Sequence, residues 1–173
     1  HIEMIGPLGF ENAYTLAMTK QKADTLKVRS IADLATHASG LSVAGDYEIF
    51  ARPEWAMLRS AYGLNFRTQR QMQPEFMYRA VSEGEVDVIA AYTSDGQIST
   101  YGLDVLADTK HAIPSYDAIL LISPKRVGDE KLLAALKPLV DSIDIAAMRE
   151  ANARASNGGD TPDSSARWLW ERV

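Results

Sequence analysis

The sequence contains no cysteine among its 173 residues. Disulfides, thiolate nucleophiles and zinc–thiolate sites are therefore excluded. Positive charge is also scarce, because 18 Lys and Arg residues stand against 23 Asp and Glu residues, for a net charge of −5. With no basic block in the chain, we expect no nucleic-acid partner. No apolar run approaches the roughly 20 residues that a membrane-spanning helix needs.

Catalytic and nucleotide-binding motifs are missing as well. The chain has no G-x-S-x-G elbow, no P-loop and no G-x-G-x-x-G fingerprint. His1, His37 and His111 are far apart in sequence and none has the spacing of a metal ligand. We interpret them as surface histidines, and we expect neither a metal site nor a cofactor.

The charged side chains give no clear sign of an active site. Without a partner base or a metal-ligand set, the aspartates are more simply interpreted as turn and cap residues than as acid–base catalysts. The dispersed arginines are expected on solvated faces. An enzyme on this scaffold is therefore not expected. The residues in question are Asp87, Asp95, Asp104 and Asp108, and Arg52, Arg59, Arg67, Arg70 and Arg79.

Residues 86–91 form an apolar run that is interrupted only by Asp87. This pattern is typical of a strand covered on both faces, as in a parallel sheet flanked by helices. The run ends in Tyr-Thr-Ser-Asp-Gly, and Asp-Gly is a turn signal. Ligands of open α/β sheets bind at the carboxyl ends of the strands. We therefore expect the centre of the sheet and the ligand site to meet here.

Strands alternate with helices up to residue 123, and helices alone follow. The pattern predicts an α/β unit with a largely parallel sheet. On the helix 75–83, the side chains of Phe76, Met77 and Ala80 are expected to face the core. Expected strands are 2–5, 13–18, 41–44, 66–72 (an edge strand), 86–91, 103–107 and 116–123 (fully buried), with a loop at 8–12. Expected helices are 31–37 (starting in a capping box), 54–62, 75–83, 129–140, 144–155 and 163–172.

Tyr14, Tyr92 and Tyr116 each lie at the boundary of an expected strand. Tyrosines at strand ends mostly serve packing. If the three ends converge, however, the rings would form an aromatic box. Such a box holds a quaternary ammonium by cation–π attraction, worth about 0.5–2 kcal/mol per ring. Polar contacts to the other end of the ligand would come from Asn12, Thr93 and Ser94.

Several stretches in order resemble the osmoprotectant-type substrate-binding proteins of ABC importers, the glycine betaine/carnitine/choline group. They cover most of residues 7–123, and the combination of GFENAY, AYTSDG and PSY is more specific than any one of them. The matching stretches are PLGFENAYTLAM, SIADLA, EIFARPEW, the Tyr62-Gly63 pair, MYRAVSEGEVDVIAAYTSDGQI and LADTKHAIPSYDAILLI.

The resemblance implies a type II periplasmic-binding-protein fold that closes on its ligand by a hinge. It implies a hinge strand and first-lobe remnant at residues 1–13, an α/β ligand-binding lobe at 14–117, and a return strand with C-terminal first-lobe helices at 118–173. The cage tyrosines of the family correspond to Tyr14, Tyr92 and Tyr116. Asn12 and Thr93 match positions beside the ligand.

The sequence also departs from the family pattern. A preceding segment of about a hundred residues, a typical lobe size, is missing, so we expect an excised piece or a mature fragment with an incomplete first lobe. Exposed apolar surface on that lobe would favour a homodimer. Glu11 stands where a second Asn is common, and Ala112-Ile113 replaces an aromatic pair, so another zwitterion such as ergothioneine is an alternative ligand.

The expected function is solute binding for an ABC importer, with a small quaternary-ammonium ligand (glycine betaine, choline, carnitine or similar) and a permease subunit as partners. A ligand-sensing regulatory domain of the same fold is the alternative. The expected location is periplasmic or extracytoplasmic, with a fused permease as a further route to membrane attachment.

Overall fold

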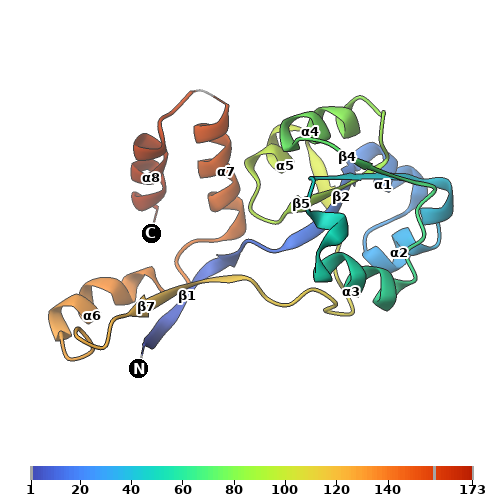
Figure 1. The fold of residues 1–173 in the computed structure, drawn as a ribbon. Coiled ribbons are helices and arrows are strands. Elements are labelled where there is room, and N and C mark those ends of the chain that lie inside the picture. Colours follow the sequence, from blue (N-terminus) through green and yellow to red (C-terminus); the bar gives the residue numbers. More distant parts are fainter. Residues whose placement is uncertain (1, 158, 173) are drawn as a thin grey trace.

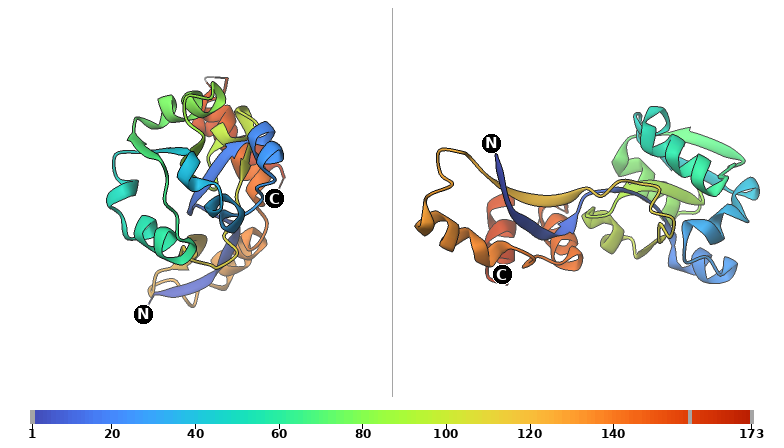
Figure 2. Two further views of the ribbon diagram at one scale, coloured as in Figure 1. Left: turned by 90° about the vertical axis from the view of Figure 1, so that its right-hand side faces the viewer. Right: turned by 90° about the horizontal axis from the view of Figure 1, so that it is seen from below.

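A computed structural model describes residues 2–157 and 159–172. The molecule is elongated, with a larger and a smaller part joined by two strands (Figures 1 and 2). Strand β1 (Glu3–Glu11) leads into the larger part and β7 (Asp117–Ile122) returns from it, and the two pair antiparallel. We call the larger part, residues 12–116, the α/β lobe. Strands β1 and β7 with residues 123–172 are the terminal region.

A five-stranded mixed sheet forms the centre of the α/β lobe, in the order β4-β3-β5-β2-β6. Its strands are β2 (Tyr14–Thr19), β3 (Ser42–Gly45), β4 (Thr68–Gln71), β5 (Val88–Tyr92) and β6 (Leu103–Val105). β3 is parallel to β4 and to β5, whereas β2 is antiparallel to β5 and to β6. Four strands therefore share one direction, and β2 runs against them. The predicted α/β fold is confirmed, and its sheet is mixed, with β5 at the centre and the expected edge strand, β4, at the edge.

Local sequence signals explain the main helix ends of the lobe. Ser30 and Asp33 form the expected capping box at the start of α2. Pro53 and Pro74 occupy the first turns of α3 and α4, where a missing backbone N–H costs nothing. The helices are α1 (Lys20–Leu26), α2 (Ile31–Ala35), α3 (Pro53–Tyr62), α4 (Pro74–Ser82) and α5 (Gly96–Thr100), with short η1 (Ala38–Gly40) and η2 (Ile49–Ala51).

The sheet of the lobe is covered on both faces. Along β5, Val88 and Ala90 belong to one buried cluster, which includes residues of α2 and α3. Ile89 and Ala91 belong to a second buried cluster on the other face, with residues of α4. Successive residues of a strand point to opposite faces, so a continuous apolar run is what a doubly covered strand requires. This confirms the expectation for residues 86–91.

The terminal region is built differently. Its helices are α6 (Glu130–Leu136), α7 (Ile145–Ser156) and α8 (Pro162–Trp170), with short η3 (Lys137–Leu139). The side chains of Asp129 and Asp144 cap α6 and α7, as the sequence predicts. Among the described residues, only Ile122 and Ala151 have buried apolar side chains outside residues 13–106. None of the described helices combines the length and the hydropathy needed to traverse a bilayer.

The expectation that residues 116–123 form a fully buried strand is wrong. In β7, exposed and partly buried residues alternate, and Leu121 is 56% exposed. The reason is that β7 pairs only with β1 and nothing in the described chain covers its outer face. The inward orientation expected for Phe76 is also wrong, because its side chain is 60% exposed while Met77 and Ala80 are buried.

Three local predictions differ from the structure. The strand at 2–5 does not stop at Gly6-Pro7, because β1 continues to Glu11 through register shifts that take up the proline. The loop expected at 8–12 is therefore mostly strand. Helices α1 and α5 are additional elements. The short polar stretch of α1 has little hydrophobic periodicity, and the Asp-Gly turn at 95–96 also begins a helix.

Candidate functional site: a tyrosine network at the carboxyl end of β5

Tyr14 and Tyr92 lie directly opposite each other, one at the start of β2 and one at the end of β5. Directly paired residues of antiparallel strands point to the same face. Their ring centroids are 4.3 Å apart, and the Tyr92 hydroxyl donates a hydrogen bond of 2.5 Å to the Tyr14 hydroxyl. The two rings therefore form one continuous aromatic surface with no space between them for a ligand.

Tyr14 is also held by charged neighbours. Its hydroxyl donates to a carboxylate oxygen of Asp46 at 3.4 Å, and the guanidinium of Arg52 lies 5.3 Å from its ring centroid. The Tyr14 side chain is buried, and this burial, together with the hydrogen bond from Tyr92, raises its pKa. The shift favours the neutral phenol, which keeps its hydroxyl proton for hydrogen bonding.

Tyr116, the third predicted tyrosine, joins the same network through Glu54. The Tyr116 hydroxyl donates to the Glu54 carboxylate, which also forms an ion pair with Arg52 at 3.2 Å. The hydrogen bond from Tyr116, followed by that from Arg52, lowers the pKa of Glu54 to about 2. Glu54 is 5% exposed and Tyr116 is 40% exposed. A buried, ionised carboxylate thus connects the exposed ring of Tyr116, through Arg52, to the buried ring of Tyr14.

Asn12 and Thr93 tie the end of β5 to the crossover between β1 and β2. The Thr93 hydroxyl donates to the Glu11 carbonyl at 2.9 Å and accepts from the Ala13 N–H at 3.0 Å. The Asn12 side-chain oxygen accepts from the Ser94 hydroxyl at 2.5 Å. Both predicted side chains therefore already have partners in the chain. They hold the strand ends together, and their contact with a ligand stays a prediction.

A cavity of about 570 Å³ lies beside this network. Its lining includes Tyr14 and Thr93 but not Tyr92 or Tyr116. The wall opposite β2 comes from the segment between β6 and β7. The cavity is lined by Glu11, Ala13, Tyr14, Thr15, Ile31, Thr93, Val105, Leu106, Ala107, Asp108, His111, Ile113, Pro114 and Ser115.

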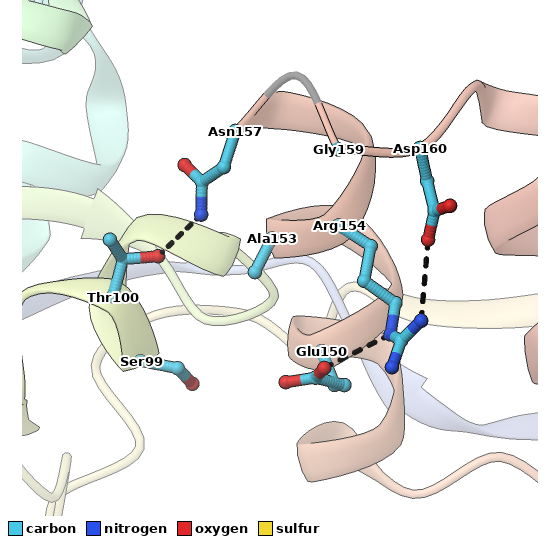
Figure 3. A pocket seen from close by; sticks show the side chains of 8 residues that line it. All are labelled: Ser99, Thr100, Glu150, Ala153, Arg154, Asn157, Gly159 and Asp160. Atoms are coloured by element: carbon cyan, nitrogen blue, oxygen red, sulfur yellow. Dashed lines mark hydrogen bonds and ion pairs between the residues drawn. The ribbon is translucent and has the colours of Figure 1, made fainter.

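A second hollow of about 570 Å³ lies between α5 and α7 (Figure 3). It contains none of the predicted ligand residues. The tyrosine network and its neighbouring cavity are therefore the better candidate site. Within residues 2–157 and 159–172, no three potential ligand side chains converge as a metal site would require. His1 lies outside the described residues.

Sequence reasoning missed the charged members of the network. Arg52 was expected on a solvated face, yet it stacks on Tyr14 and pairs with Glu54 and Glu48. The available signal was local: Pro53 begins α3, which makes Arg52 the N-cap residue and places Glu54 in the first turn. Tyr116 lies more than sixty residues further along the chain, and only the tertiary fold brings its hydroxyl to the same carboxylate.

Comparison with known proteins defines the class. A solved structure described as a glycine betaine/carnitine/choline ABC transporter has a TM-score of 0.90 and 27% identity, covering 98% of this chain and 63% of that one. The ergothioneine transport permease/ergothioneine binding protein EgtU of Helicobacter pylori is 27% identical over 98% of this chain and 31% of its own length. A glycine-betaine-binding protein of Pseudomonas aeruginosa is 31% identical over 92% of this chain and 56% of its own length.

The fold and its position among these relatives define a solute-binding domain of the type II periplasmic-binding-protein class. The chain belongs to the OpuAC family, the substrate-binding domain of ABC-type glycine betaine transport systems, and the match extends over residues 1–172. The relatives are transport proteins rather than enzymes. The chain spans about one third to under two thirds of the length of these relatives.

Proposed function

We propose that this chain carries the ligand-recognising lobe of an ABC import system and binds a small quaternary-ammonium compound at its tyrosine network. The observation that carries the proposal is a single network of contacts: Tyr92 bonds to Tyr14, Arg52 lies over the Tyr14 ring, and Tyr116 bonds to Glu54, the ion-pair partner of Arg52. Membership of a family of glycine betaine transport domains supports it. Glycine betaine, choline and carnitine are the first candidate ligands.

The geometry favours a particular mode of binding. A trimethylammonium group has no N–H to donate, so aromatic faces are its natural partners. Because Tyr14 and Tyr92 are 4.3 Å apart, the cation would lie against their shared surface rather than between them. Tyr116, which is exposed and oriented by Glu54, would close over it from the position just before β7. Arg52, which is already paired with Glu54 and Glu48, would have to exchange one of these partners for a ligand carboxylate, and Asn12 and Thr93 would be further polar contacts.

Ergothioneine is a second candidate ligand, favoured by the similarity to EgtU of Helicobacter pylori. It is a zwitterion that also carries a trimethylammonium group. The same tyrosine surface would hold that group, and the cavity beside Tyr14 and Thr93 would have to accept the ring of the ligand. Calorimetric titration with ergothioneine beside glycine betaine, choline and carnitine separates the two candidates.

We further propose that the terminal region is part of a second lobe that closes over the site. Its apolar surface is unusually exposed, at 56% for Leu121, 60% for Met4 and 66% for Trp170. Relatives of this family are longer than the chain, and a further segment of such a protein would cover this face. A homodimer is the other way to cover it, and sedimentation at rising concentration distinguishes the two. Residues near the β1–β2 crossover and β7 would then serve as the hinge.

The partner would be the permease subunit of the importer, either as a separate chain or fused as in EgtU, and the location would be extracytoplasmic. Calorimetric titration of the full-length gene product with glycine betaine, choline, carnitine and ergothioneine tests the proposal. Saturable binding of at least one compound is expected. Silence across the whole panel would refute the quaternary-ammonium assignment.

A further inference from the structure

The turn that follows β5, residues 92–95, is held by helix α7 of the terminal region. The Arg149 Nε donates to the carbonyl of Thr93 at 2.6 Å. One helical turn further along, the Asn152 Nδ2 donates to the carbonyl of Ser94 at 2.9 Å. Two successive carbonyls of one turn are thus satisfied by side chains from a segment more than fifty residues away.

Backbone packing brings α7 and α5 into direct contact. A Cβ atom on Gly96 would lie 2.2 Å from the backbone N of Ala153, so only glycine fits at the start of α5. At the far end of the contact, the Asn157 Nδ2 donates to the Thr100 hydroxyl at 3.1 Å, as Figure 3 shows. The positions 149, 152, 153 and 157 follow the spacing of a single helix face. One face of α7 is therefore fitted to the turn and to α5.

The same turn presents the predicted ligand residues. Asp95 accepts from the backbone N–H of Tyr92 at 3.1 Å and from the Tyr78 hydroxyl, which fixes where Tyr92 leaves the sheet. Thr93 bonds to the β1–β2 crossover through its hydroxyl and to Arg149 through its carbonyl. A displacement of the turn would therefore move Tyr92 relative to its partner Tyr14.

We infer that Arg149 and Asn152 are positioning residues of the tyrosine site, which set ligand affinity by fixing the turn at residues 92–95. Among the described residues, no side chain of α7 is hydrogen-bonded to any of the three tyrosines, so the effect passes through the backbone of the turn. The inference rests on the proposed function for its binding readout. Its structural readout, the environment of Tyr92, does not depend on any ligand.

The test compares Arg149→Met and Asn152→Leu in the full-length gene product. Both substitutions keep much of the side-chain volume and remove the donor. Choline and glycine betaine affinities are measured by calorimetry, and the ring resonances of isotope-labelled tyrosine are recorded without ligand. Both variants are expected to weaken binding by about threefold to thirtyfold, the range of couplings transmitted through a protein. The Tyr92 resonance is expected to shift in both.

Arg154→Met is the matched control, since Arg154 lies on the same helix but bonds to Glu150 and Asp160 and stacks on Trp168. It should change neither affinity nor the Tyr92 resonance. Equal loss in the control, or an unchanged Tyr92 resonance in both folded variants, would overturn the inference. If the wild-type protein binds no ligand of the panel, the proposed function fails. The inference about Arg149 and Asn152 is then tested by the Tyr92 resonance alone. If Arg149→Met does not fold, Asn152→Leu decides.

Discussion

The α/β lobe and the terminal region contrast most in what covers their strands. Strand β5 has buried clusters on both faces, whereas β7 is an apolar strand with alternate side chains open to solvent. In sequence the two strands look alike, as short apolar runs of similar length. The difference shows that an apolar run indicates that a strand needs covering, but does not indicate which part of the protein covers it. For β7 that layer is what we propose a further segment supplies.

The largest effect that tests this contrast comes from matched leucine truncations. Leu16 in β2 is fully buried, and Leu121 in β7 is 56% exposed. Leu16→Ala should cost about 2–5 kcal/mol through lost burial and a cavity. Leu121→Ala should stay within about 0.5 kcal/mol, as for most surface changes. Urea unfolding of this chain measures both. Equal costs would mean that the terminal region has a core that the exposed fractions do not reveal.

A smaller effect concerns the contacts of Glu54 with Tyr116 and Arg52 within the α/β lobe. Glu54 has a folded-state pKa of about 2, below its ordinary value of 4.5, so its ionised form stabilises the fold. This contribution is fully present above about pH 4.5 and is lost as the pH falls through about 2. The stability advantage of the wild type over Glu54→Gln should therefore shrink steadily on acidification, as followed by thermal unfolding. A pH-independent difference would mean that Glu54 acts through packing alone.

The smallest expected effect lies on the surface of the terminal region. Arg154 and Glu150 form an ion pair whose side chains are 38% and 48% exposed. Pairs of this kind are screened by water and typically contribute about 0–1 kcal/mol. Glu150→Gln should therefore lower the melting temperature only slightly, and 1 M salt should erase the difference. A large drop in melting temperature that persists in 1 M salt would contradict this expectation and would show that polar contacts hold the terminal region together.

Much of the lobe was predictable because its signals are local. Proline at the start of α3 and α4, the Ser30–Asp33 capping box and the alternating clusters along β5 all follow from short stretches of sequence. The three tyrosines were predictable as strand-end residues. The ion pair between Arg52 and Glu54 was not, because its importance depends on Tyr116, just before β7, meeting the Glu54 carboxylate in the folded chain. For the same reason the contacts of Arg149 and Asn152 carry no sequence signal.

The ligand residues follow the same division. The sequence placed Asn12 and Thr93 near the tyrosines, and the structure brings them to the same strand ends. The hydrogen bonds of Thr93 to the β1–β2 crossover, and of Asn12 in that crossover to Ser94, could not be anticipated, because they depend on how β5 and the crossover meet. Whether they also contact a ligand stays a prediction. Calorimetry on Thr93→Val, which keeps the shape and removes the hydroxyl, would measure both roles together.

The central claim is that the tyrosine surface recognises positive charge, and choline beside its uncharged tert-butyl analogue tests it most directly. The two molecules have nearly the same shape, so only the cation distinguishes them. In the full-length protein, we predict that choline binds at least tenfold more tightly, equivalent to about 1.4 kcal/mol and within the range of a desolvated cation–π contact. Replacing Tyr92 by leucine should remove most of that preference. Equal affinity for the two compounds, or a preference that survives in Tyr92→Leu, would contradict the account.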